Sequence, residues 1–88
     1  MPTISMFYGI IIRMYYAPKE HGPAHIHVYY QNATGVIYIS DCKVASGNLA
    51  PKQVRLVTAW IEIHRNELMT DWKRCQNGQK PFKIQPLK

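Results

Sequence analysis

The sequence predicts an α+β fold, with a small antiparallel sheet of three to four strands followed by one long helix or two consecutive helices packed on it. The first half is rich in β-branched and aromatic residues, and glycines and prolines interrupt it. The second half instead repeats apolar residues every three or four positions, which is typical of a helix. A chain of 88 residues with 47% apolar and 18% charged residues fits a single globular domain with one modest core.

The sheet is expected to occupy roughly the first 45 residues. Strands are predicted over residues 4–16, 24–31 and 34–40, with a fourth short strand at 43–45. Gly9 can bend the first strand into two pieces. Residues 17–23 carry two prolines and a glycine, which is typical of a turn. Asn32 and Ala33 are expected to form a tight hairpin connection between the second and third strands.

The helical part is predicted over residues 51–76, and an extended basic tail over 77–88 follows it. Pro51 suits the first helical turn, where its missing N–H costs nothing, and Gly78 suits the end. The predicted buried residues form two neighbouring rows: Val54, Val57, Ile61, His64, Leu68, Trp72 and Cys75, and then Leu56, Trp60 and Ile63. A straight helix of this length would span about 39 Å, which is long for so small a domain, so a break near residues 64–66 is expected.

The net charge of +6 suits an anionic partner such as RNA, DNA or an acidic protein, although it also serves solubility. Two widely separated cysteines and the lack of a signal peptide or a long apolar segment indicate a reduced, cytoplasmic setting without membrane association. Because the core is small, a partner chain or a homodimer is expected. Nothing in the sequence calls for a cofactor.

Strand alternation predicts a polar, aromatic face on the sheet. His25, His27 and Tyr29 fall on one side of their strand, opposite the apolar residues between them. Arg13 and Tyr15 fall on the corresponding side of the first strand, and Tyr38 is a further candidate in the third. We expect these side chains to share one face, although a register slip of one residue would invert the assignment.

His25 and His27 are about 6–7 Å apart if they lie on one strand, and three interpretations remain open. They can be polar residues on an exposed face. They can chelate a divalent metal, with His21, Glu20 or His64 completing the shell. They can also act as general base and general acid in RNA cleavage, because histidine titrates near neutral pH.

The remaining candidate residues would bind or stabilise the substrate. Arg13 would neutralise the charge that develops on the phosphorus centre, and Tyr15 and Tyr29 would stack on bases. Lys80 and Lys83 in the tail would contact phosphate. His64 lies in the helical stripe and is either a packed core residue or a third site histidine delivered by the helix.

Four blocks in order, "MPTIS", "FYGIIIRMYY", "PAHIHVYY" and "VTAWIEIHRNELMTDW", resemble the small bacterial family known as domain of unknown function 4160 over roughly residues 1–86. The resemblance implies a toxin of a type II toxin–antitoxin pair, with a cognate antitoxin encoded beside it. The matching polar residues are Arg13, Tyr15, His25, His27, His64 and Glu67. The sequence departs from the family at Cys42 and Lys43, where the resemblance implies a glycine and an acid.

Three functions therefore follow as expectations. The first is a toxin that acts on RNA or translation, with metal-independent RNA cleavage by the histidines. The second is a basic module that binds nucleic acid or a partner protein without catalysis. The third is a metal-dependent hydrolase.

Overall fold

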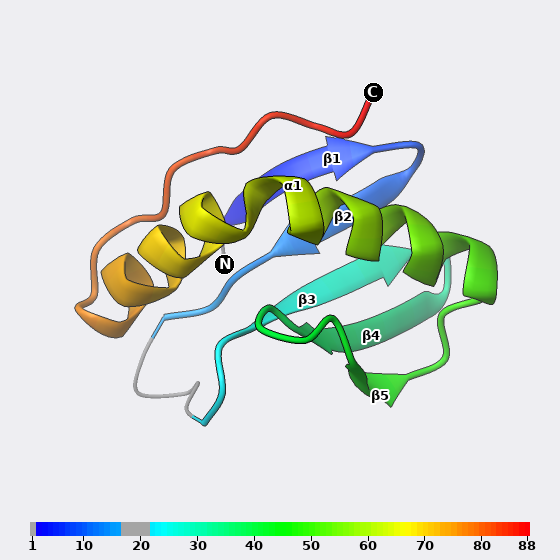
Figure 1. Ribbon diagram of the computed structural model, residues 1–88, viewed down its shortest axis with the longest axis horizontal. Helices are drawn as coiled ribbons and strands as arrows, with labels where there is room; N and C mark the ends of the chain where they lie inside the picture. The colour runs from blue at the N-terminus through cyan, green and yellow to red at the C-terminus, as the bar shows by residue number, and fades with distance from the viewer. Residues whose placement is uncertain (1, 17–21) are drawn as a thin grey trace.

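The computed structural model describes residues 2–16 and 22–88 and has five antiparallel strands followed by one helix (Figure 1). The elements are β1 (Thr3–Phe7), β2 (Ile10–Arg13), β3 (His25–Tyr30), β4 (Ala33–Tyr38), β5 (Val44–Gly47) and α1 (Pro51–Gln76). The strands form one sheet in the order β1-β2-β3-β4-β5. The α+β class is confirmed, whereas the predicted count of three to four strands is too low.

The additional strand arises because residues 4–16 fold into a hairpin rather than one strand. Phe7 pairs with Ile10, and the two residues between them, Tyr8 and Gly9, have φ angles of 51° and 78°. Two successive positive φ angles define the type I′ turn, whose twist matches that of antiparallel strands. The next hairpin turns at Gln31 and Asn32, one residue earlier than predicted.

The helix begins and ends as the sequence predicts, and its backbone is irregular at one residue. His64 has φ −114° and ψ 22°, so two helical segments meet there at a kink within the predicted range. The longest dimension of the Cα trace is 33 Å, shorter than a straight helix of this length. The kink therefore lets both halves of α1 stay packed on the sheet.

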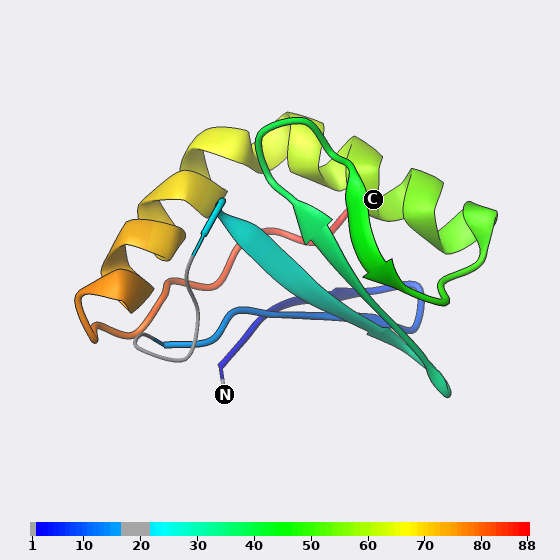
Figure 2. The ribbon, with the colours of Figure 1, turned by 90° about the horizontal axis from the view of Figure 1, so that it is seen from below.

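The core lies between α1 and one face of the sheet (Figure 2). The sheet contributes buried isoleucines, including Ile10, Ile12 and Ile26, and α1 contributes Trp60 and Trp72. The two tryptophans are thus core residues, as the helical periodicity predicts. The helical stripe is narrower than predicted, because Ile63 is 67% exposed.

The tail after α1 is extended, as predicted, and runs along the β1 edge of the sheet (Figure 1). The Ile84 N–H donates to the Ile4 carbonyl over 2.8 Å, and Trp60 Nε1 donates to the Gln85 carbonyl over 2.8 Å. These bonds fix the tail to both the sheet and the helix. Among the residues described, no helix combines the length and the apolar character needed to cross a lipid bilayer.

Candidate functional site

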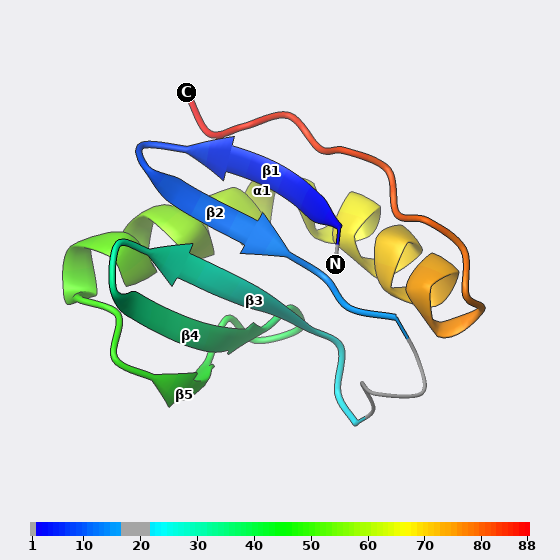
Figure 3. The ribbon, with the colours of Figure 1, turned by 180° about the vertical axis from the view of Figure 1, so that it is seen from behind.

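The second face of the sheet is open on the side opposite α1, in the part of the chain that the structure describes (Figure 3). The pairing puts Arg13 opposite His27, Ile11 opposite Tyr29, and His25 opposite Tyr38. Directly paired residues project to the same side of a sheet. This shared surface, the histidine face, comprises Arg13, Tyr15, His25, His27, Tyr29 and Tyr38. Its composition follows the sequence prediction.

Arg13 and the two tyrosines form a connected cluster around His27. The Arg13 guanidinium lies 5.1 Å from the centre of the Tyr29 ring, and Arg13 Nε donates to Thr3 Oγ1 over 3.3 Å. The hydroxyls of Tyr15 and Tyr29 share a hydrogen bond. The Tyr15 ring meets the His27 ring edge-on, with 4.3 Å between centroids. A cation, two aromatic rings and an imidazole therefore occupy one partly exposed patch.

His25 lies deeper than His27. Its residue surface is only 8% exposed, and its ring lies 4.9 Å from the Trp72 ring and 5.3 Å from the His27 ring, between centroids. Nδ1 of His25 is 2.9 Å from the Pro23 carbonyl oxygen. A carbonyl can only accept, so Nδ1 carries the proton in this bond, and the neutral ring has its lone pair on Nε2. The sequence predicts the shared face but not the burial of this histidine.

His64 lies at the kink of α1, and its side chain contacts other residues of the same helix. Its Nδ1 is 2.6 Å from Glu67 Oε1, and its ring is 5.7 Å from the Trp60 ring. No hydrogen bond or ring contact joins it to either strand histidine among the residues described. The alternative in which the helix delivers His64 to the histidine strand is therefore not seen.

Lys80 and Lys83 belong to the tail and flank the sheet rather than lying on the histidine face. The Lys80 carbonyl accepts from Arg74 Nε over 2.9 Å. Lys83 lines a groove of about 440 Å³ between β1 and the tail, together with Thr3 and Glu67. This groove brings together none of the histidines.

A smaller hollow of about 140 Å³, the β3–β5 hollow, opens directly beside His27. Its lining residues are His27, Tyr29, Thr34, Gly35, Val36, Ser46 and Gly47. Strand pairing explains the set, because His27 pairs with Val36, and Val36 with Ser46. No local sequence pattern predicts this hollow. Only the pairing of β4 with β5, which carries a register shift, brings Ser46 to it.

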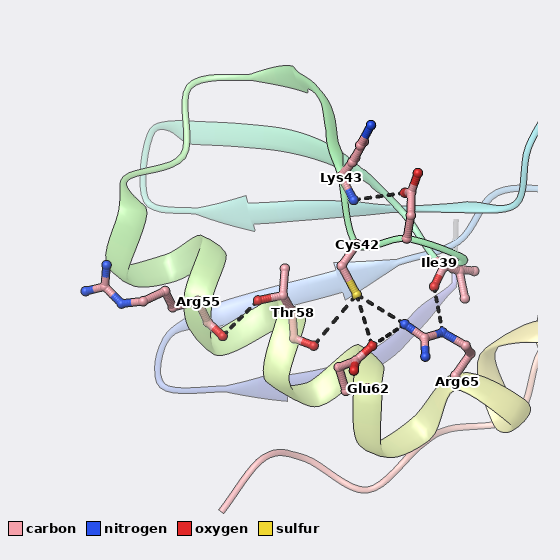
Figure 4. Close-up of polar contacts among 8 residues, drawn as sticks. Ile39, Cys42, Lys43, Arg55, Thr58, Glu62 and Arg65 are labelled. Atoms are coloured by element: carbon pink, nitrogen blue, oxygen red, sulfur yellow. Dashed lines mark hydrogen bonds and ion pairs between the residues drawn. The ribbon is translucent and has the colours of Figure 1, made fainter.

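Cys42 and Lys43, where the resemblance implies a glycine and an acid, lie in the β4–β5 connection (Figure 4). Cys42 has φ 61°, a left-handed conformation that glycine adopts without strain. Its Sγ lies 3.4 Å from Arg65 Nη2, and Arg65 also donates to Glu62 and to the Ile39 carbonyl. The cluster thus fastens this connection to α1. Lys43 is exposed, and its backbone N–H donates to Asp41.

Neither cysteine thiol is suited to act as a nucleophile. Burial raises the pKa of the Cys42 thiol, and burial, with the Asp71 carboxylate nearby, raises that of Cys75 to about 11. A protonated thiol is a poor nucleophile. Both cysteines are free.

The metal-site interpretation depends on further ligands beside His25 and His27. In residues 2–16 and 22–88, no group of three or more histidine, cysteine, aspartate or glutamate side chains has a metal-binding arrangement. Glu20 and His21, two of the candidate ligands, lie outside the described residues.

Fold and site together define a small α+β protein with a cationic, aromatic and histidine-bearing sheet face. The chain belongs to the family described as Domain of unknown function (DUF4160), which matches residues 9–73. The matched segment includes the whole histidine face and His64, but it excludes Lys80 and Lys83. Comparisons with curated proteins and with solved structures found no match.

Proposed function

We propose that this protein is the toxin of a bacterial type II toxin–antitoxin pair and that it acts on RNA through its histidine face. The observation that carries the proposal is the grouping of Arg13, Tyr15 and Tyr29 around His27 on the open side of the sheet, with the ring of the buried His25 beside that of His27. An open sheet with aromatic side chains is a common platform for single-stranded RNA, because bases stack on the rings while cations hold the phosphates.

The two histidines suit the proton transfers of RNA cleavage. Nε2 of neutral His25 removes the proton from a ribose 2′-hydroxyl, whose oxygen then attacks the adjacent phosphorus. Protonated His27 gives its proton to the departing 5′-oxygen, so the products are a 2′,3′-cyclic phosphate and a 5′-hydroxyl. Arg13 stabilises the extra negative charge on the phosphorus centre in the transition state. The ring separation of 5.3 Å lets one phosphate and its ribose lie against both imidazoles.

The net charge of +6 supports both proposed partners, RNA and an acidic antitoxin. Lys80 and Lys83 contribute to the same positive field from the tail, where they contact phosphates outside the cleavage site. The protein acts in the cytoplasm, where its RNA substrate and its antitoxin are found. The metal-dependent alternative would need ligands beyond the two strand histidines.

A second candidate is a module that binds RNA or its partner without cleaving it. The burial of His25 favours this reading, since a general base must reach the substrate and only 8% of this residue is exposed. In that case the histidine face is a stacking surface, and substitution of the histidines leaves growth inhibition intact.

Salt-dependent binding of a fluorescent single-stranded RNA tests the proposed surface. Arg13→Ala should weaken binding. It should also make the plot of log affinity against log salt concentration less steep by about one, because one phosphate contact is lost. Arg55→Ala is the matched control, because it removes the same charge from an exposed position on α1. Equal losses in the two variants would mean that net charge, and not the histidine face, drives binding.

Induction of the gene in bacterial cells tests the toxin role. We expect growth arrest by the unmodified protein and relief by His27→Ala, with normal accumulation of both proteins on a gel. Unimpeded growth on induction of the unmodified protein would contradict the toxin proposal.

A further inference from the structure

The β3–β5 hollow provides a recognition site next to the proposed cleavage centre. His27 and Tyr29 from β3 form one wall, and Thr34, Val36 and Ser46 from β4 and β5 form the rest. Arg13 lies on the β2 side of the same two residues, since it pairs with His27 and stacks over Tyr29. The cation and the hollow therefore flank His27 on opposite sides.

The size of the hollow restricts what can enter it. Its volume is about 140 Å³, and a cavity of about 150 Å³ accommodates one benzene ring. A single six-membered ring with small substituents therefore fits, whereas the fused rings of a purine exceed the space. The open mouth of the hollow leaves room for the ribose to which the ring is attached.

The lining is chemically suited to the polar edge of such a ring. Thr34 and Ser46 each contribute a hydroxyl, which can donate or accept a hydrogen bond. Neither hydroxyl has a hydrogen-bond partner in the part of the chain that the structure describes. The Tyr29 ring adds an aromatic wall. Hydroxyls that can reverse their roles accept both uracil, with its N3–H, and cytosine, with its amino group.

We infer that the β3–β5 hollow binds one pyrimidine base of single-stranded RNA and thereby selects the nucleotide next to the cleaved phosphate. The inference rests on the proposed RNA activity and adds the substrate preference. With the base in the hollow and a phosphate at Arg13, the intervening sugar–phosphate lies over His27. The strand of RNA then crosses β2, β3 and β4 rather than running along them.

The test compares labelled homopolymers of about ten nucleotides, of uridine, cytidine, adenosine and guanosine, with inorganic polyphosphate as a probe without bases. The unmodified protein should bind the two pyrimidine chains about tenfold more tightly than the purine chains. Ser46→Phe, which fills the hollow, should abolish this preference and leave polyphosphate affinity within about twofold. Arg13→Ala should weaken the binding of polyphosphate and of RNA to a similar extent.

Ala45→Phe is the matched control, because it adds the same ring to β5 at a residue that does not line the hollow. Thr34→Phe fills the hollow from β4 and replaces Ser46→Phe if that variant fails to fold. If RNA binds but purines and pyrimidines bind equally, or if Ser46→Phe and Ala45→Phe behave alike, the pyrimidine site is refuted while the RNA proposal stands. If the unmodified protein binds no RNA at all, both proposals fall.

Discussion

Asp71 offers a quantitative test of how the tail is held. This carboxylate is only 1% exposed, and its Oδ1 accepts the Phe82 N–H over 2.9 Å. Its Oδ2 is buried, and no other group in residues 2–16 and 22–88 forms a hydrogen bond with it. Asp71→Ala leaves the Phe82 N–H without its acceptor, which costs about 1–3 kcal/mol of unfolding free energy. Asp71→Asn keeps an acceptor oxygen in place and should therefore cost less than the alanine substitution.

The way in which the unfolding free energy of the same variants changes with pH is an independent test. Burial raises the pKa of the Asp71 carboxyl, while the Phe82 N–H and Arg74 oppose that rise. A carboxyl whose pKa is higher in the folded state binds its proton more tightly there, so protonation stabilises the fold. This stabilisation is fully present below the pKa that the carboxyl has in the unfolded state. It disappears as the pH rises through the pKa that the carboxyl has in the folded state. The unmodified protein should therefore gain stability relative to Asp71→Asn as the pH falls from 7 toward 4.

Urea unfolding followed by the fluorescence of the buried Trp60 measures both effects. For a domain of this size, a loss of about 1 kcal/mol also lowers the melting temperature by about 4–8 °C. If Asp71→Ala is as stable as the unmodified protein, the Asp71–Phe82 hydrogen bond does not hold the tail. If acidification stabilises Asp71→Asn relative to the unmodified protein, the Asp71 carboxyl does not have a raised pKa in the folded state.

Three further predictions concern backbone positions with positive φ. Tyr8→Asn should raise the unfolding free energy by about 0.5–1 kcal/mol, because asparagine tolerates a φ of 51° in a type I′ turn better than tyrosine does. A lower urea midpoint for this variant would contradict the prediction. Cys42→Gly should be about 1 kcal/mol more stable than Cys42→Ala, since both lose the thiol and only glycine relieves the left-handed φ; thermal unfolding of the two variants decides it. Gly47→Ala would place a Cβ 2.2 Å from the Thr34 carbonyl oxygen and should loosen β5. Faster hydrogen exchange at the Asn48 amide, which donates to that carbonyl, together with weaker RNA binding, is the expected result.

The helix and the histidine face were predictable because local periodicity encodes both. The interval of three to four residues predicts the helix, Pro51 and Gly78 indicate its two ends, and alternation predicts His25, His27 and Tyr29 on one side of β3. Even the kink at His64 was anticipated, because a straight helix would be longer than so small a domain.

The features that the sequence did not reveal depend on contacts between distant segments. All four residues of β5 are exposed, so no apolar alternation marks the full strand. His25 is buried because Trp72, which is distant in the sequence and belongs to α1, packs against it. The fixed course of the tail depends on single bonds such as that from Ile84 to Ile4, which no local pattern signals. The β3–β5 hollow likewise requires the register of β4 and β5.

The most direct test of the proposed chemistry is the cleavage of a labelled single-stranded RNA by the purified protein. We expect products that end in a 2′,3′-cyclic phosphate, and a loss of about 100-fold or more in rate for His27→Ala and for His25→Ala. Arg55→Ala should cleave at the unmodified rate. Cleavage that persists undiminished in the two histidine variants, or RNA binding by the unmodified protein without any cleavage, would contradict the acid–base role of the histidine face.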